Sequence, residues 1–512
     1  MGFMNAIANE LNNEKQTTEN GAVGFRSTGK ALLDLNFSVT SLRSASATDI
    51  VDKFIKAYFE DEIPAIKWLF YARDARQGLG ERRLFRVVME EFAKQKPETV
   101  KALIPLVAEY GRYDDLWCLL ETELADNVIS YVKQQLTEDI KNMKKNLSVS
   151  LLAKWIPSEN ASSNTTKKYA NIIRKGLGLT SRTYRKTLSE MRKYIDVVER
   201  KMSAKEWGAI DYEAVPSRAN LIYNGAFLRN DETRRRAYLS ALEKGEAKIN
   251  SSVNFPHDIV HKYSSVYGVD KTLEALWNAL PDTVQGCGNT IVVADGSGSM
   301  TCRVGNTNVS ALEVANALAI YFAERSSGEF KDKYITFSQR PQLVDLSRGK
   351  TLCDKLTIAR NHNEVANTNI EAVFDLILAT AINNKMAKED IPANVLICSD
   401  MEFDDCAITN ADRSNGWSYS CVRPTTTLFE QIEQKYKNAG YKLPRLIFWN
   451  INSRTGTIPV KENDLGVALV SGFSVNIVKM VMSNKTDPYE CLLETINGER
   501  YQAVEDAVKD IV

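Results

Sequence analysis

The chain has 512 residues, more than one ordinary hydrophobic core supports, and a length of roughly 150 residues per domain predicts several domains. Hydrophobic residues make up 44% of the chain and charged residues 25%, and 65 cationic side chains balance 65 acidic ones. This composition excludes a disordered chain and a globally basic one. Any nucleic-acid binding therefore has to come from a local patch.

Cysteine usage and the N-terminal sequence predict an intracellular, cytoplasmic protein. The eight cysteines are dispersed and include no CxxC pair, which favours a reducing compartment. No long apolar segment occurs at the N-terminus, so we expect neither secretion nor membrane insertion. Gly2 follows Met1, but Ala6 occupies the position where a myristoylation signal needs Ser or Thr.

The first half of the chain is predicted to be helical. Residues 1–30 are polar and are expected to form an irregular arm, and from about residue 48 apolar side chains recur every three or four residues, as in Ile50, Phe54 and Tyr58. This spacing is typical of amphipathic helices packed as a bundle or solenoid. We expect a helical-repeat domain over residues 31–284.

Four arginines surround a glycine turn in this half, at positions 73, 76, 82 and 83. One interpretation is that Arg73, Arg76, Arg82 and Arg83 bind phosphate. The alternative is that they form ion pairs that fix a helix-turn-helix corner, because Asp74 and Glu81 are close in sequence.

A second basic segment runs from residue 167 to residue 201 and carries three acids, at 190, 196 and 199, against eleven cations. Tyrosines at 169, 184 and 194 are interleaved with the cations, a mixture suited to phosphate contacts and base stacking, although a solvated helical face is the alternative. The candidate RNA-binding residues of this segment are Lys167, Lys168, Arg174, Lys175, Arg182, Arg185, Lys186, Arg192 and Lys193.

His257 and His261 have the spacing of a zinc-protease helix, with Asp258 where the general base would lie. The only other histidine, His362, falls in a different expected domain. We favour the alternative, in which Pro256 opens a helix whose histidines contact neighbouring side chains.

The pattern changes to strand, loop and helix over residues 285–490. Short apolar strands are predicted at 291–293, 334–337, 394–398, 446–451 and 466–470, with helices between them that include a capping box at Ser310 and Glu313. Helices between apolar strands predict a doubly wound parallel sheet. A final helix is expected over 491–512.

Three loops of this second half supply oxygen donors where ligands gather in such sheets, at the carboxyl ends of the strands. They contribute Asp295, Ser297 and Ser299, then Thr368, then Asp400. Oxygen donors suit a hard divalent cation, Mg²⁺ or Mn²⁺. The alternative is a hydrogen-bonded turn that holds no metal.

This half resembles a von Willebrand factor A domain, whose metal-ion-dependent adhesion site combines Asp-x-Ser-x-Ser with a Thr on a second loop and an Asp on a third. The resemblance implies that Ser297 and Ser299 bind the metal directly and that Thr368 binds it directly or through water. It implies that Asp295 and Asp400 accept hydrogen bonds from metal-bound water. The second loop reads Ala366-Asn367-Thr368 where Gly-Gly-Thr is more usual.

Further motifs extend the resemblance to most of residues 20 to 480. These are GFRSTGKALLDL, YARDARQGLGERRLF, YGRYDDLW, FPHDIV, FWNINSR and LVSGFS. They look like a little-characterised family of cellular, viral and phage genomes that joins a helical region to an A domain. That family is similar in layout to the Ro autoantigen proteins, whose ring of helical repeats, the TROVE module, binds RNA in ribonucleoproteins.

The resemblance favours a non-catalytic, Ro-like RNA-binding protein with a divalent-metal adhesion site, virus- or phage-encoded or cellular. The alternative is a protein-interaction module whose metal binds an acidic residue of a partner. An enzyme is not expected, because the chain has three histidines and no Ser/His/Asp or Cys/His array, although Asp295, Asp400 or Glu402 could serve as a base for metal-assisted hydrolysis.

Overall fold

The computed structural model describes residues 14–284, 289–404, 427–461, 465–481 and 485–512, and it divides into two compact units. The sheet unit comprises Met1–Ser46, Phe255–Asp270 and Pro281–Thr495 within those described residues. The helical unit comprises Ala47–Asn254, Lys271–Leu280 and Ile496–Val512. Each unit is therefore assembled from segments far apart in sequence.

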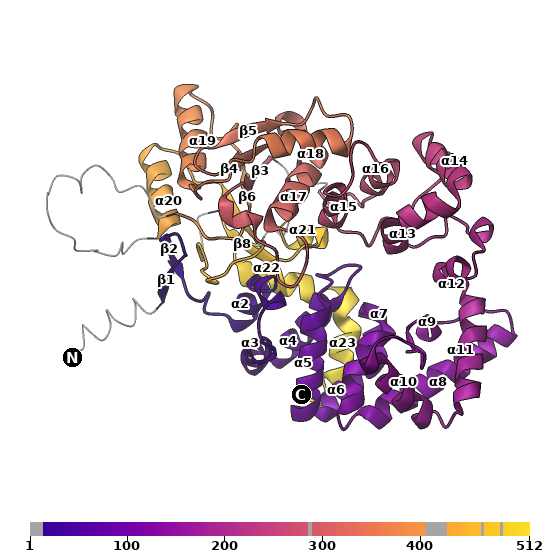
Figure 1. Cartoon of the computed structure of the whole chain (residues 1–512). Helices are drawn as coiled ribbons and strands as arrows, with labels where there is room; N and C mark the ends of the chain where they lie inside the picture. The colour runs from indigo at the N-terminus through magenta and orange to yellow at the C-terminus, as the bar shows by residue number, and fades with distance from the viewer. Residues whose placement is uncertain (1–13, 285–288, 405–426, 462–464, 482–484) are drawn as a thin grey trace, which may run out of the picture. The chain divides into compact units, whose positions relative to one another are not determined.

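A six-stranded sheet forms the centre of the sheet unit (Figure 1). Its strand order is β5-β4-β3-β6-β7-β8. The strands are β3 (Thr290–Asp295), β4 (Lys333–Phe337), β5 (Gln342–Asp345), β6 (Asn394–Ser399), β7 (Arg445–Asn450) and β8 (Val467–Ser471). The five predicted strands are confirmed and pair in parallel. The sheet is mixed, however, because β5 was not predicted and adds to the edge antiparallel to β4. Strand β5 is only four residues long and mostly unburied, so its sequence has no apolar run from which a strand could be predicted.

Helices cover both faces of this sheet. They include α17 (Ala311–Arg325), α18 (Leu352–Asn361), α19 (Glu371–Asn383) and α20 (Leu428–Asn438). Adjacent strand residues point to opposite faces, so the contact of Trp449 with Phe322 of α17 and that of Phe448 with Phe429 of α20 place these two helices on opposite sides. The predicted doubly wound architecture is confirmed, as is the capping box between Ser310 and Glu313 at the start of α17.

The N-terminal segment contributes a hairpin and a helix to the sheet unit. β1 (Lys15–Thr17) pairs antiparallel with β2 (Val23–Phe25), and α2 (Ala31–Phe37) packs beside β8. Phe25 and Ile458 exchange backbone hydrogen bonds of 2.8 Å. The described part of the segment expected to be an irregular arm is thus ordered by contacts with residues more than 400 positions away.

The helical unit consists of short helices joined by tight turns, as predicted. They are α3 (Ala47–Glu60), α4 (Glu62–Arg73), α5 (Arg82–Gln95), α6 (Pro97–Leu103), α7 (Val107–Tyr110), η3 (Tyr113–Glu121), α8 (Ala125–Lys144), α9 (Leu152–Trp155), α10 (Asn164–Gly176), α11 (Ser181–Ile195), α12 (Val198–Ser203), α13 (Ser217–Asn230), α14 (Glu232–Glu243), α16 (Lys271–Asn278) and α23 (Gln502–Val508). The last of these, α23, packs beside α4 and α6. Across the described ranges, no helix is both long and apolar enough to cross a membrane.

The cysteines lie partly beyond these ranges. Cys287, Cys406 and Cys421 fall outside the described residues. The other five cysteines, at 118, 302, 353, 398 and 491, are free thiols.

The segment Phe255–Asp270, whose helix α15 (Pro256–Tyr263) was expected within the helical half, belongs to the sheet unit, where α15 packs on α17.

Candidate metal centre and nucleic-acid interface

Strand β3 delivers Asp295 to the carboxyl end of the sheet, and the loop after it brings two serine hydroxyls together. The Oγ atoms of Ser297 and Ser299 lie 3.1 Å apart, and the backbone N–H of Ser297 donates to Asp295 Oδ1 at 2.9 Å. The backbone N–H of Gly296 donates to Phe337 O of the neighbouring strand β4 at 2.8 Å. Asp295 and Ser297 are fully buried, so the fold fixes these oxygens firmly.

The loop after β6 places Asp400 beside Asp295. Ser399 Oγ donates to Asp295 Oδ2 at 2.5 Å, which ties the two strand ends together. Met401, which follows Asp400, has φ +62°, a left-handed conformation that non-glycine residues seldom adopt. This turn leaves Asp400 only 1% exposed and lets the backbone N–H of Glu402 donate to its Oδ1 at 3.3 Å.

Thr368 is held at the same edge by residues that the sequence did not single out. Ser338, at the end of β4, accepts from Ala366 N at 3.0 Å and donates to Asn367 O at 3.0 Å. Thr368 N donates to Asp404 Oδ2 at 3.0 Å. Thr368 is 2% exposed, and its hydroxyl accepts a hydrogen bond from Asn20 Nδ2 at 3.2 Å. All five predicted metal-site residues thus lie at the carboxyl end of the sheet: Asp295 ends strand β3, and the other four lie on three loops connected by hydrogen bonds.

Electrostatics at this edge favour a cation. Burial, followed by the charge of Asp400, raises the pKa of Asp295 to about 7, and burial raises the pKa of Asp400 as well. Asp400 Oδ2 is buried without a hydrogen-bond partner among the described residues, and Arg454 Nη2 lies 3.6 Å from it. Two buried carboxylates and an orphaned oxygen fit a divalent cation, which stabilises their charged forms.

The donor set differs from the common clusters of acidic and imidazole ligands. Within the described ranges, no group of three or more His, Cys, Asp or Glu side chains could hold a metal ion. The candidate centre has only two carboxylates, and its other donors are hydroxyls. Neutral hydroxyls leave much of the charge of a bound cation unbalanced, which suits an additional anionic ligand.

Glu402 is committed to the loop before β8 and to the N-terminal hairpin. Its buried carboxylate accepts from the backbone N–H groups of Arg454 at 2.8 Å, Thr455 at 2.9 Å and Glu19 at 2.9 Å. The hydroxyls of Ser453 and Thr455 also donate to it. Both carboxylate oxygens of Glu402 are thus engaged by donors from these two segments. Glu402 therefore serves to fix the loops around the candidate metal centre.

The first arginine patch forms ion pairs within the helical unit. Arg73 is 4% exposed and its Nη2 lies 2.6 Å from Asp115 Oδ2, while Arg86, which the sequence did not single out, contacts both Asp114 and Asp115. A side chain on Gly78 would meet Tyr71 O at 2.0 Å, which accounts for glycine at this turn. For Arg73, the interpretation as an ion pair that fixes the fold is therefore the one that the structure supports.

The other arginines of this patch are more exposed. The side chain of Arg76 is 58% exposed and donates to Glu109 O at 2.6 Å. That of Arg82 is 47% exposed and lies 3.8 Å from Asp114 Oδ2. Arg83 is exposed at the start of α5. The phosphate interpretation remains a prediction for these three.

A groove of about 1080 Å³ crosses the second basic segment, between helices α9, α11, α12 and α13. Six cations and two acids line it, together with Trp155 and Tyr223. The cations are Arg112, Lys154, Arg185, Arg192, Arg200 and Arg218. Arg112 stacks over Trp155 with its guanidinium carbon 3.9 Å from the ring centroid. Leu151 and Ile222 line the groove at 50% and 52% exposure, so it offers apolar as well as cationic surface.

The predicted cations of the second segment divide into two groups. Arg192 donates to Ala153 O, Ile156 O and Ser158 Oγ at 2.7 to 2.8 Å, and burial lowers its pKa. Arg174 contacts Glu159 at 2.9 Å. These two brace the fold. The exposed members of the set are Lys167, Lys168, Lys175, Arg182, Arg185, Lys186 and Lys193, of which Lys168 contacts Glu121 at 2.6 Å.

The interleaved tyrosines are less available for stacking than the sequence suggested. Tyr184 is 1% exposed and its hydroxyl donates to Pro157 O at 2.7 Å. The hydroxyl of Tyr194 donates to Leu147 O at 2.7 Å, and Tyr169 is half-buried. Trp155 and Tyr223, which sequence reasoning missed, are the aromatic side chains at the groove that remain half-buried.

The two histidines of α15 contact different neighbours. His257 is 6% exposed and its ring lies 4.7 Å from that of Phe473, while His261 Nδ1 lies 3.0 Å from Glu313 Oε1. The pair does not converge on a common point. Helix α15 therefore packs through its histidines, as the favoured interpretation predicted.

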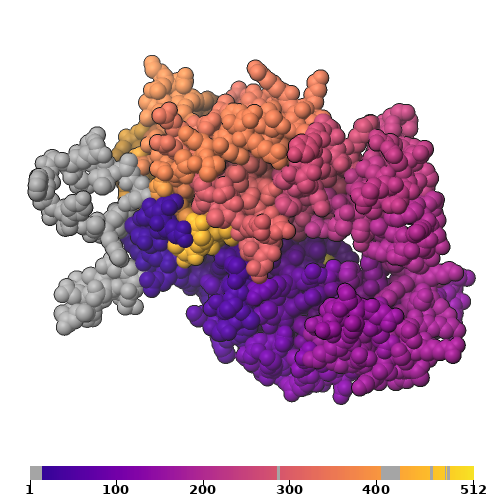
Figure 2. Space-filling model, in the orientation of Figure 1, coloured from indigo at the N-terminus to yellow at the C-terminus, as the bar shows by residue number. Residues whose placement is uncertain are grey.

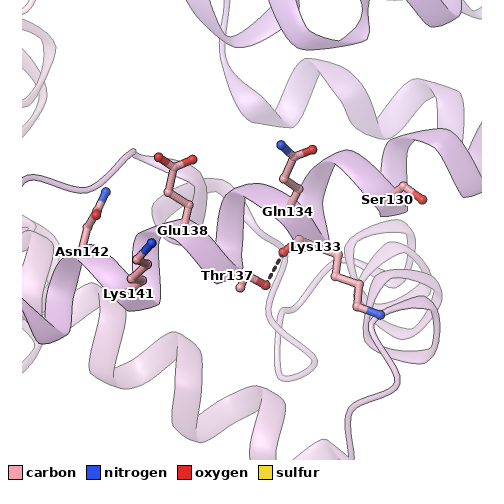
Figure 3. A pocket seen from close by; sticks show the side chains of 7 residues that line it. All are labelled: Ser130, Lys133, Gln134, Thr137, Glu138, Lys141 and Asn142. Atoms are coloured by element: carbon pink, nitrogen blue, oxygen red, sulfur yellow. Dashed lines mark hydrogen bonds between the residues drawn. The ribbon is translucent and has the colours of Figure 1, made fainter.

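A smaller hollow of about 530 Å³ lies along α8 in the helical unit (Figure 3). All seven side chains that line it come from this one helix, and the hydrogen bond drawn among them runs from Thr137 Oγ1 to Lys133 O at 2.7 Å. Lys133 and Lys141 are exposed beside Glu138. Since no other helix contributes a lining group, this hollow has few groups that could recognise a ligand.

Comparisons with known proteins match nearly the whole chain. Residues 289–510 match the family model described as Domain of unknown function (DUF7788), and residues 160–290 match Domain of unknown function (DUF2828). A protein of Acanthamoeba polyphaga mimivirus, Uncharacterized protein L728, is 30% identical over 519 residues, covering 94% of this chain and 86% of the relative. Among solved structures, the crystal structure of Deinococcus radiodurans RO (RSR) protein matches with 13% identity and a TM-score of 0.34, covering 90% of this chain and 93% of that one.

Proposed function

This chain belongs to the family of the mimivirus protein L728, and we propose that it is a non-catalytic RNA-binding protein whose sheet unit carries a divalent-metal site. The observation that carries the RNA proposal is the groove of the helical unit, which is lined by Trp155 and Tyr223 and, besides the structural Arg192, by five further cationic side chains. Cations that contact phosphates, placed beside aromatic faces that stack on bases, are the combination single-stranded nucleic acids require.

Exposed cations extend the proposed RNA surface beyond the groove. The side chain of Arg185 lines the groove and is 55% exposed, and that of Lys186 is 75% exposed on the same helix. Their acidic neighbours, Glu159 and Glu190, lie 3.9 Å and 3.8 Å away, so these ion pairs are loose and can exchange for a phosphate. Arg192 and Arg174 are assigned to the fold rather than to RNA.

The RNA proposal is tested by sequencing the nucleic acid that co-purifies with the whole chain. We expect a defined RNA class with the wild type and its loss when Arg185→Glu and Lys186→Glu are combined. The matched control combines Lys133→Glu and Lys141→Glu, two exposed lysines of α8, and is expected to retain the RNA. Equal recovery from all three proteins, or no RNA from the wild type, would contradict the proposal.

The metal proposal rests on the convergence of Asp295, Ser297, Ser299, Thr368 and Asp400 and on the orphaned Asp400 Oδ2. The hydroxyls of Ser297, Ser299 and Thr368 would hold Mg²⁺ or Mn²⁺ directly, and the two carboxylates would orient its water. When bound, the cation supplies an open position for an oxygen donor. Calorimetric titration with Mn²⁺ tests the site, and absence of binding to the wild type would contradict it.

A second candidate function is metal-dependent binding of a protein partner. It is favoured by Arg454, whose side chain is 32% exposed beside the buried Asp400. A guanidinium next to a bound cation would contact a partner's carboxylate on the metal. In a pulldown of bound partners, chelation of the metal is expected to abolish partner capture, and capture that survives chelation would count against this candidate.

A further inference from the structure

The turn between β1 and β2 lies on the loop that carries Asp400. Thr18 Oγ1 donates to Phe403 O at 2.7 Å, Glu19 N donates to Glu402 Oε2 at 2.9 Å, and Asn20 Nδ2 donates to Glu402 O at 2.6 Å. Figure 2 shows this hairpin, in indigo, at the surface of the sheet unit. A segment from the start of the chain is therefore part of the wall of the candidate metal centre.

The side chain of Glu19 forms an ion pair with Arg454, the arginine beside the candidate metal centre. Arg454 Nη2 lies 2.8 Å from Glu19 Oε2 and 3.6 Å from Asp400 Oδ2. The side chains of Glu19 and Arg454 are 50% and 32% exposed, whereas that of Asp400 is 1% exposed. An acidic side chain of the protein itself thus already holds the guanidinium that borders the buried carboxylate.

We propose that Glu19 is a built-in competitor that holds Arg454 until an acidic side chain of a peptide ligand displaces it at the metal centre. This inference rests on the proposed metal site. A guanidinium binds carboxylates through paired hydrogen bonds, so it can serve either Glu19 or an incoming acid. The resident group is itself a glutamate on a short exposed turn, which favours an acidic peptide over an RNA phosphate as the occupant.

Release of Glu19 does not require the hairpin to leave. Its ion pair is exposed to solvent, and such pairs contribute little to stability. Its backbone N–H, by contrast, donates to the buried Glu402, and the neighbouring Asn20 and Thr18 keep their own hydrogen bonds. The side chain can therefore rotate away from Arg454 while the turn remains seated.

The test measures how protein-bound Mn²⁺ relaxes the glutamate side-chain protons of the peptide acetyl-Gly-Glu-Gly-amide in solution. Replacing Glu19→Gln is expected to raise the apparent affinity for the peptide about twofold to fivefold, the effect of removing one exposed ion pair. The matched control is Glu14→Gln on the same hairpin, whose side chain is 62% exposed and lies 3.8 Å from Lys461. This control is expected to leave the affinity unchanged.

Calorimetric Mn²⁺ titration of each protein separates the two levels of the proposal. Equal peptide affinity in wild type and Glu19→Gln, with Mn²⁺ bound to both, would overturn the competitor role and leave the metal site standing. Preferential relaxation of the dinucleotide uridylyl-uridine by Glu19→Gln would overturn the acidic ligand in favour of RNA phosphate. Failure of Mn²⁺ to bind the wild type would overturn the metal site itself, and the competitor role with it.

Discussion

The oxygen donors of the sheet unit and the cations of the helical unit differ in how firmly the fold holds them. Asp295, Ser297 and Asp400 are buried, and hydrogen bonds fix the loops that carry them. Arg185 and Lys186 are exposed, and their ion pairs with Glu159 and Glu190 are loose, at 3.9 Å and 3.8 Å. A metal needs donors at set distances, whereas a nucleic acid can be bound by exposed cations that neutralise its phosphates. This difference is what we expect if the sheet unit binds a metal and the helical unit binds RNA, as proposed.

The largest expected effect concerns the buried donors. Changing Asp400→Asn removes a charge and alters the orphaned oxygen, and we expect Mn²⁺ affinity to fall by about 10- to 100-fold, as for other residues that orient metal ligands. Calorimetric titration measures this affinity. The matched control is Asp390→Asn, an exposed aspartate of the same unit. A loss of affinity in both variants, or in neither, would remove the distinction between buried and exposed carboxylates.

Glu402→Gln should affect the stability of the fold more than ligand binding. The neutral amide cannot accept all the hydrogen bonds that the backbone and hydroxyl groups of the surrounding loops donate, and leaving buried donors unsatisfied costs about 1–3 kcal/mol. We expect a lower midpoint of denaturant unfolding and faster hydrogen exchange in residues 15–25. Glu389→Gln, an exposed glutamate, is the control. Unchanged exchange in the hairpin would contradict the structural role of Glu402.

Arg192→Lys separates structural cations from ligand-binding ones in the helical unit. Lysine cannot reproduce the three hydrogen bonds of the guanidinium to Ala153, Ile156 and Ser158, so we expect a loss of about 1–2 kcal/mol in unfolding free energy. RNA affinity of the folded protein should change little. A large drop in affinity, measured by fluorescence anisotropy at a temperature where the variant is folded, would place Arg192 in the RNA interface instead.

The smallest effect expected is a pH dependence in the sheet unit. Burial opposes the ionisation of Glu313, but hydrogen bonds from Ser264, Ser310 and His261 outweigh it and lower its pKa below 4.5. The contribution of ionised Glu313 to the free energy of unfolding is therefore full above pH 4.5, and it is lost as pH falls through the lowered pKa. Glu313→Gln should reduce stability by about 1 kcal/mol at pH 7 and by less at pH 3. Thermal unfolding at both pH values checks this, and equal losses would contradict it.

The same contrast explains what the sequence could predict. Apolar strands followed by Asp295 or Asp400 are local patterns, so five of the six strands could be predicted from the sequence, and the resemblance to an A domain added Thr368 to the candidate metal-site residues. Asn20, Asp404, Ser338 and Arg454 could not be found in this way. Asn20 meets Thr368 across 348 positions, and no local periodicity records such a contact.

In the helical unit the sequence showed where cations are concentrated, but not which of them make contacts within the fold and which remain exposed. Arg73 and Arg192 look like their exposed neighbours in the sequence, yet the fold turns them onto Asp115 and onto backbone carbonyls. Helical spacing predicts which face is apolar, but it does not tell which cation on the polar face meets another helix. Trp155 and Tyr223 reach the groove only because α9, α11, α12 and α13 pack together there.

The central claim is that exposed cations of the helical unit bind RNA through its phosphates. The most direct measurement is RNA affinity of the whole chain as a function of salt, by fluorescence anisotropy of a labelled single strand. We predict a linear fall of log affinity with log salt, with a slope about one to two units shallower when Arg185→Glu and Lys186→Glu are combined, since each lost phosphate contact removes roughly one unit. Affinity that is independent of salt, or an identical slope in the variant, would contradict the account.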